Sequence, residues 1–279
     1  MPNPIADPFV EVPDTDATSE LVSLEATEAG AVTVTLNRAD KKNAFNAELI
    51  GALRETFETL RDQEAIRVVF LRGAGGTFSA GADLEWMRGA ADYTEADNRD
   101  DAMQMAIMLK HLYDIPALTV ALVEGGGFGG GAGLAAACDM VVAVQDAKFA
   151  FSEVKLGLIA ATISPYVVAA IGARRARRLF ASGEVFDAES AQRFGLVDEV
   201  VADTSALAAA KARIAGTQQL CAPGAVAESK RLVVEVSGRE IDHGLMSHTA
   251  RRIAAQRVGE EGQAGVRAFL EGRKAPWAE

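Results

Sequence analysis

The chain has 279 residues, enough to bury a large core as one domain or as a core with a smaller appendage. Its 28 basic and 39 acidic residues give a net charge of −11, which argues against nucleic acid and anionic membranes as general partners. Cys138 and Cys221 are the only cysteines, too few for a disulfide framework, and no secretory signal or membrane span is apparent, so we expect a cytoplasmic protein.

The first part of the chain predicts a hairpin and a helix. Residues 1–20, rich in Pro, Asp and Thr, are expected to form a mobile tail. Two short apolar runs, 21–24 and 31–36, are separated by Gly30 and predict a β-hairpin. A helix should follow, capped by Asn43 or Asn46, with apolar residues at helical spacing at Leu49, Leu53, Phe57 and Leu60.

The middle of the chain alternates apolar runs with helical segments. We predict buried strands at 68–71, 115–123 and 140–144, and a shorter strand at 148–151. The charged residues 93–101 are expected to be mobile, with a helix after them from about 102 to 113 that ends before Pro116. This alternation of strands and helices is typical of an α/β fold.

Helices dominate the rest of the chain. Ser164-Pro165 is expected to begin one, and others are predicted over 174–181 and 188–194, followed by an extended piece at 197–201. Beyond residue 204 no strand pattern is found, and helices are predicted at 205–217, 224–238 and 241–270, the last broken near 259–262. We therefore divide the chain into a core, 21–204, and a helical C-terminal region, 205–279.

The stretch from Val120 to Asp139 is where we expect a site. A buried strand is followed by seven glycines within nine residues, and the composition then changes to Ala and Leu, which favour a helix. Backbone N–H groups are free at such a turn, and without Cβ atoms a ligand can approach them closely. A flexible linker is the alternative, but a linker is rarely flanked by a buried strand and a buried helix.

A second small-residue loop, Phe78–Leu84, adds a candidate partner for the glycine turn. Two N–H groups, one from each loop, converging on one oxygen would form an oxyanion hole for a developing enolate. The carboxylate that fits beside them is Glu153, because the apolar Phe151 and Val154 would raise its pKa toward neutrality. The alternative for Glu153 is a surface glutamate at a strand end.

Other kinds of site are not indicated by the sequence. The three histidines, His111, His243 and His248, have no Cys or Asp at metal-ligand spacing. No Gly-x-Ser-x-Gly motif occurs, the glycine turn lacks the Lys-Ser/Thr pair of a phosphate loop, and no acidic residue stands where NAD binding would need one.

Five segments resemble, in the right order, the enoyl-CoA hydratase/isomerase (crotonase) superfamily. They are Asn37-Arg38 with Asn43-Ala44, Gly76–Leu84, Gly129–Gly131 with Cys138-Asp139, Phe149 to Gly157 around Glu153, and Ala268–Glu271 with Arg273-Lys274. The resemblance spans about Leu21 to Lys274. It implies an α/β fold, a crotonase-type spiral of ββα units, and a helical C-terminal region that trimerises, often into a dimer of trimers.

The resemblance also implies an acyl-CoA thioester as the ligand, with coenzyme A a part of the substrate and no metal or further cofactor. The thioester oxygen would accept hydrogen bonds from the N–H groups of Ala82 and Gly130. The substrate would also meet Gly129, Gly133 and the loop of Ala80, Gly81, Asp83 and Leu84, which receives the adenine. Lys41 or Lys42 would meet the CoA phosphates.

Some residues depart from the family pattern. Hydratases of the family usually carry two glutamates that hold water; one matches Glu153, but the other matches position 133, which is Gly. A single acid is typical of many isomerases of the family. Glu124, just before the glycines, is either a displaced second acid or, as its spacing favours, a structural residue.

The segments 151–158 and 163–167 nevertheless resemble bacterial methylglutaconyl-CoA hydratases of leucine degradation. There Lys155 would pair with a substrate carboxylate, or is simply an exposed lysine. The sequence therefore predicts a lyase that hydrates a 2-enoyl-CoA, with 3-methylglutaconyl-CoA as the expected substrate. The alternatives are a Δ3,Δ2-enoyl-CoA isomerase that uses Glu153 alone and a non-catalytic acyl-CoA binding protein.

Overall fold

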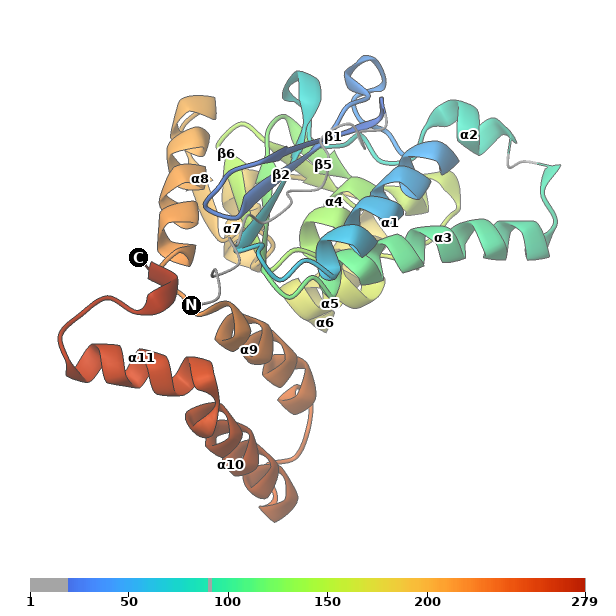
Figure 1. Cartoon of the computed structure of the whole chain (residues 1–279). Coiled ribbons are helices and arrows are strands. Elements are labelled where there is room, and N and C mark those ends of the chain that lie inside the picture. The colour runs from blue at the N-terminus through green and yellow to red at the C-terminus, as the bar shows by residue number, and fades with distance from the viewer. Residues whose placement is uncertain (1–19, 90–91, 279) are drawn as a thin grey trace.

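The structure is a computed structural model that describes residues 20–89 and 92–278. The mobile tail predicted for residues 1–20 lies outside the described residues, apart from Glu20. Two sheets and a set of surrounding helices make up the described part of the chain (Figure 1).

The larger sheet has six strands in the order β1-β2-β3-β4-β6-β9. β1 and β2 form the predicted antiparallel hairpin, and every other neighbouring pair is parallel. The central strands are almost fully buried on both faces, as expected for a parallel sheet covered by helices. The strands are β1 Val22–Ala26, β2 Ala31–Leu36, β3 Val68–Gly73, β4 Leu118–Val123, β6 Met140–Val144 and β9 Glu199–Val201.

A smaller sheet of three strands, β5-β7-β8, lies beside the larger one. Its strands are β5 Gly126–Phe128, β7 Lys148–Ala150 and β8 Val185–Asp187. Only β7 was predicted: β5 lies within the glycine stretch, and β8 has three residues and shows no periodicity. Phe149 of β7 stacks on Phe186 of β8 with ring centroids 5.9 Å apart, which fixes the two strands against each other.

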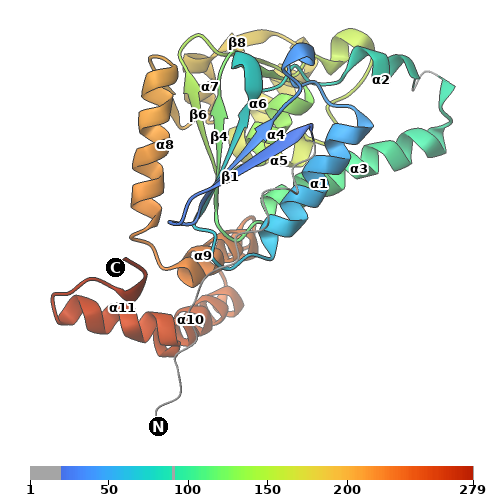
Figure 2. The same cartoon turned by 45° about the horizontal axis from the view of Figure 1, so that its top comes forward.

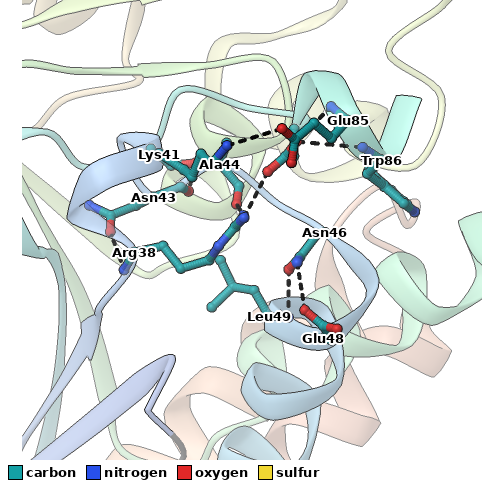
Figure 3. Close-up of polar contacts among 11 residues, drawn as sticks. Arg38, Lys41, Asn43, Ala44, Asn46, Glu48, Leu49, Glu85 and Trp86 are labelled. Atoms are coloured by element: carbon teal, nitrogen blue, oxygen red, sulfur yellow. Dashed lines mark hydrogen bonds and ion pairs between the residues drawn. The ribbon is translucent and has the colours of Figure 1, made fainter. Parts of the chain in front are cut away.

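Helices cover both faces of the larger sheet. In two views α1 and α3 lie together along one side, while α8 lies on the opposite side (Figures 1 and 2). Asn46, not Asn43, caps α1: its Oδ1 accepts a hydrogen bond from the Leu49 N–H at 3.0 Å (Figure 3). The core helices are α1 Ala47–Arg61, α2 Leu84–Gly89, α3 Glu95–Tyr113, α4 Gly130–Ala136, α5 Ser164–Ile171, α6 Ala173–Ser182, α7 Ala188–Phe194 and α8 Thr204–Gln218.

The start of α3 contradicts one prediction. Residues 95–101 were expected to be mobile, but they are the first two turns of this helix. Thr94 caps the helix by accepting a hydrogen bond from the Asp97 N–H, and the Asp97 side chain accepts one from the Thr94 N–H in return. This capping box satisfies donors at the helix start, so the charged residues that follow are helical and solvated.

The last three helices extend away from the sheets: α9 Pro223–Val236, α10 His243–Val258 and α11 Glu260–Leu270, the last two separated at Gly259 as predicted (Figure 1). A short 3-10 helix, η6 Pro276–Ala278, follows. The Lys230 ammonium of α9 donates to the carbonyls of Ile115 and Ala117, at 2.7 and 2.9 Å, and to Asp139. None of the described helices is long and apolar enough to cross a bilayer.

Candidate active site

Backbone hydrogen bonds join the two loops that the sequence predicted to form the site. The Phe78 N–H donates to the Glu124 carbonyl at 2.9 Å, and the Ser79 N–H donates to the Gly126 carbonyl at 3.2 Å. In return the Phe128 N–H donates to the Ser79 carbonyl at 3.0 Å. The two loops therefore run side by side in a register set by the main chain.

Ala82 presents a free backbone donor on the first loop. It forms a parallel bridge with Phe45, in which the Phe45 N–H donates to Gly81 at 2.7 Å and the Asp83 N–H donates to Phe45 at 2.8 Å. Such a bridge uses the groups on either side of Ala82, and its own N–H has no acceptor among the described residues. Gly81 before it has φ +88°, and a Cβ there would lie 2.7 Å from the Phe128 carbonyl oxygen.

Gly130 presents the second donor, on the glycine turn. It is the first residue of α4, so its N–H has no partner within the helix, and none of the other described residues accepts it. A Cβ at Gly130 would lie 3.1 Å from Met105 Cε and 3.3 Å from Phe45 Cδ2. Apolar side chains thus pack against Gly130 on the side where a Cβ would point.

Glu153 lies beside the same turn, at the start of the 3-10 helix η5 Glu153–Leu156. Its Oε1 would be 3.1 Å from a Cβ on Gly129, so the carboxylate approaches the backbone that leads into α4. Its Oε2 is buried and has no hydrogen-bond partner among the described residues. Burial raises the pKa of this carboxyl above its ordinary value, as a general acid or base requires.

A buried ion pair supports the Ala82 loop. Arg38 Nη2 lies 2.8 Å from Asp83 Oδ2, and Nη1 donates to the Ala44 carbonyl at 2.6 Å (Figure 3). Asp83 also accepts a hydrogen bond from the Glu85 N–H at 2.7 Å at the start of α2. Its carboxylate is therefore engaged within the protein, and it acts on the neighbouring Ala82 by holding the loop.

The side chain of Asn43 fixes the conformation of the turn at residues 38–43. It is fully buried with φ +54°, and it donates to the carbonyls of Ala74 and Thr77 while accepting from the Arg38 N–H. This turn includes the 3-10 helix η2 Ala39–Lys41. The segment that accepts the Asn43 hydrogen bonds includes the 3-10 helix η3 Ala74–Gly76. From the sequence, Asn43 is considered only as a helix cap and Arg38 is given no role, although both residues stand in the first of the family-like segments.

The predicted CoA-binding residues lie around the same loop. The Lys42 carbonyl accepts the Ala80 N–H at 2.9 Å, which places the basic turn next to the small-residue loop. Lys41 forms an exposed ion pair with Glu85 at 3.4 Å, and Leu84 is 68% exposed. Lys41, Lys42 and Leu84 are thus on the surface beside the Ala82 loop.

Lys155 is exposed on η5, and its side chain points in a different direction from that of Glu153. A Cβ at Gly183, the residue that ends α6, would lie 3.2 Å from Lys155 Cε. In a 3-10 helix residues two apart point in different directions, so the Lys155 stem packs toward Gly183 while Glu153 faces Gly129. Its ammonium has no ion pair within the described part of the chain.

Glu124 has structural partners. Its Oε1 accepts a hydrogen bond from Thr204 Oγ1 at 2.6 Å, and its Oε2 lies 3.6 Å from Arg72 Nη2. The residue therefore ties the start of α8 to β3. This agrees with the structural role that its spacing favoured.

The assembled features define a class of enzyme: an α/β protein with two backbone donors from neighbouring loops and a buried carboxylate beside one of them. Residues 26–279 match the model of the enoyl-CoA hydratase/isomerase family, and the chain belongs to this family. It is thus an enzyme of the crotonase superfamily with an acyl-CoA as its substrate.

Individual relatives agree with this assignment. The chain is 33% identical to the enoyl-CoA hydratase AKT6-1 of Alternaria alternata over 88% of this chain and 80% of that protein. A solved enoyl-CoA hydratase of Shewanella pealeana is 37% identical, with a TM-score of 0.88 and coverage of 92% and 96% of the two chains. Pseudomonas aeruginosa AtuE is also 37% identical, with a TM-score of 0.89 over 93% of this chain and 100% of that one. The predicted fold class is confirmed.

Proposed function

We propose that the protein hydrates a 2-enoyl-CoA thioester through an enolate intermediate. The observation that carries the proposal is the arrangement of three groups on adjoining segments: the free N–H of Ala82 on the first loop, the free N–H of Gly130 on the glycine turn, and the Glu153 carboxylate beside Gly129. Two fixed donors stabilise negative charge on a thioester oxygen, and one carboxylate moves the proton.

The reaction proceeds through these groups as follows. Glu153 takes a proton from water as the water oxygen bonds to C3 of the substrate. The electron pair of the C2–C3 double bond moves toward the thioester, and the N–H groups of Ala82 and Gly130 stabilise the resulting enolate oxygen. Glu153 then returns its proton to C2. Water is added with no change of oxidation state, so no metal or cofactor beyond the coenzyme A of the substrate is required.

For the acyl group we propose 3-methylglutaconyl-CoA, a substrate of leucine degradation. The support is the resemblance of residues 151–158 and the exposure of Lys155, which stands two residues after Glu153 and has no ion pair among the described residues. Replacing Lys155 with Met is expected to raise KM for this substrate without raising KM for crotonyl-CoA. Equal changes for both substrates would contradict the role of Lys155.

A second candidate function is Δ3,Δ2-enoyl-CoA isomerisation. Here Glu153 removes a proton from C2 of a 3-enoyl thioester and returns it to C4 through the same stabilised oxyanion. The observation that favours it is Gly133, which leaves Glu153 as the carboxylate beside the turn.

A substrate panel separates these functions. Wild-type protein is incubated with crotonyl-CoA, 3-methylglutaconyl-CoA and a 3-enoyl-CoA. Loss of enoyl-thioester absorbance means hydration, and its appearance from the 3-enoyl substrate means isomerisation. Tight binding without turnover of any of the three would instead identify an acyl-CoA binding protein and overturn the proposal. Glu153→Gln should abolish turnover and keep binding.

We also propose that the protein is a trimer or a dimer of trimers. The C-terminal helices expose many large apolar side chains: Val233, Val234, Met246, Ile253, Val258, Val266, Phe269 and Leu270. Apolar surface of this extent is typical of an interface between subunits. Light scattering on the purified protein measures the mass directly, and Phe269→Glu, at a residue that is 84% exposed, should reduce it.

A further inference from the structure

Gly129, the N-cap of α4, and Gly133 within α4 each have a side chain from another element resting on them. Glu153 Oε1 lies against Gly129, and Ile163 lies against Gly133. The Gly133 N–H donates to the Gly129 carbonyl at 3.0 Å, so the two positions are one helical turn apart. Ile163 therefore contacts the chain one turn beyond the residue that Glu153 approaches.

Ile163 fills the space above Gly133. An ideal Cβ at position 133 would lie 2.1 Å from Ile163 Cγ2 and 2.4 Å from Ile163 Cβ. Both distances are far below van der Waals contact, and Ile163 is only 2% exposed, so it has little room to move. Since Ile163 Cβ is itself too close, alanine at 163 would still overlap a side chain at 133, whereas glycine would not.

Resting on the proposed function, we infer that Ile163 is a specificity-determining residue. It excludes any side chain, and so a second carboxylate, from position 133, and it places an apolar side chain there instead. Both hydration and isomerisation pass through an enolate held by the same two donors, but hydration also needs a place for water. The balance between the two reactions thus depends on what stands at 163.

The inference predicts a coupling between positions 133 and 163. Gly133→Glu alone should lower the melting temperature strongly, because the new side chain overlaps Ile163. Combining it with Ile163→Gly should cost clearly less than the sum of the two single losses, whereas combining it with Ile163→Ala should cost nearly the sum. Gly133→Glu with Ile171→Gly is the matched control, because Ile171 is equally buried in α5 but is not among the atoms nearest Gly133.

The activity readout is the ratio of the hydration rate, measured with crotonyl-CoA, to the isomerisation rate, measured with a 3-enoyl-CoA. In the Gly133→Glu/Ile163→Gly variant a second carboxylate enters the site, and we expect this ratio to rise at least tenfold above that of the wild type. A well-folded, CoA-binding double variant with an unchanged ratio would overturn the inference, as would a Gly133→Glu variant as stable as the wild type.

The experiments distinguish a wrong proposed function from a wrong inference about Ile163. If the wild-type protein turns over none of the enoyl-CoA substrates, the proposed function itself is wrong, and this is known before any variant is made. If the wild type is active and the 133–163 coupling is absent, only the inference about Ile163 is wrong.

Discussion

The guanidinium of Arg38 joins two segments by contacting Asp83 at 2.8 Å and the Ala44 carbonyl at 2.6 Å, although 45 residues separate the charged pair. Burial alone would raise the pKa of the Asp83 carboxyl, but the hydrogen bonds from Arg38, Glu85 and Trp86 together hold this pKa below its ordinary value. Asp83 is thus ionised and immobile, one residue after the Ala82 donor.

We predict that Arg38→Met lowers kcat about 10- to 100-fold, because a displaced donor stabilises the enolate poorly. Arg38→Lys should restore only part of kcat, since an ammonium cannot contact both partners in the planar geometry of a guanidinium. Steady-state kinetics with crotonyl-CoA measure both. A wild-type kcat in Arg38→Met would show that the pair does not position Ala82.

The matched control for that variant is the exposed pair of Lys41 and Glu85 in the same region. Breaking the buried Arg38–Asp83 pair should cost about 3–5 kcal/mol of unfolding free energy, because it leaves an uncompensated buried charge. Glu85→Gln should cost less than about 1 kcal/mol, because water screens the exposed pair. Urea unfolding at neutral pH compares the two.

The raised pKa of Glu153 predicts the pH dependence of activity. The reaction needs an ionised Glu153, and burial favours its protonated form. The acid limb of kcat/KM should therefore fall at a pH above 4.5, the ordinary value for a glutamate. A limb at or below that pH would contradict the role of Glu153 as the base.

The same shift predicts that Glu153 destabilises the folded protein at neutral pH. A carboxyl whose pKa is raised on folding favours the folded state only while it is protonated, and this contribution is lost as the pH rises through the folded-state value. Glu153→Gln should therefore melt at a higher temperature than the wild type at pH 7 to 8. The difference should shrink toward pH 4, as calorimetry across this range can test.

Much of the fold was predictable because apolar periodicity determines it. The helix α1 and the strands β2, β3 and β6 lie where their patterns indicated. β5 was missed because it lies within the glycine stretch, and β8 because it is a short piece between two helices. The beginning of α3 was missed because its capping box stands among charged residues that resemble a solvated loop.

Only those parts of the candidate site that lie in local motifs could be proposed from the sequence. The two loops and Glu153 are local motifs, each readable from a few consecutive residues. Ile163 could not be found in this way, since its importance comes from contact with a glycine 30 positions earlier in the chain. No local pattern indicates which side chain covers a given glycine.

Glu124 provides a test that separates a structural acid from a catalytic one. Its carboxylate accepts a hydrogen bond from Thr204 at 2.6 Å, and glutamine keeps that acceptor while losing the charge near Arg72. Glu124→Gln should keep kcat within about twofold of the wild type and lower the unfolding free energy by about 0.5–1 kcal/mol. A loss of turnover comparable to that of Glu153→Gln would make Glu124 a second catalytic acid.

Gly81 provides a test of the contact between the two loops. Gly81→Ala should lower both stability and kcat, because a Cβ there would lie 2.7 Å from the Phe128 oxygen on the opposite loop. Gly76→Ala is the control: it has a similar positive φ, +73°, but open space around it. Gly76→Ala should therefore lower stability through backbone strain and leave kcat largely unchanged, whereas equal losses of kcat would refute the contact.

The register between the two loops is set by main-chain groups: Phe78 with Glu124, Ser79 with Gly126, and Phe128 with Ser79. Every amino acid except proline supplies the same N–H and C=O groups, so most side chains in these loops can diverge between lineages without disturbing the oxyanion donors. Change is constrained at the glycines of close approach and at side chains that hold the loops, such as Asp83. A scaffold of this kind can keep its backbone donors while the remaining side chains change.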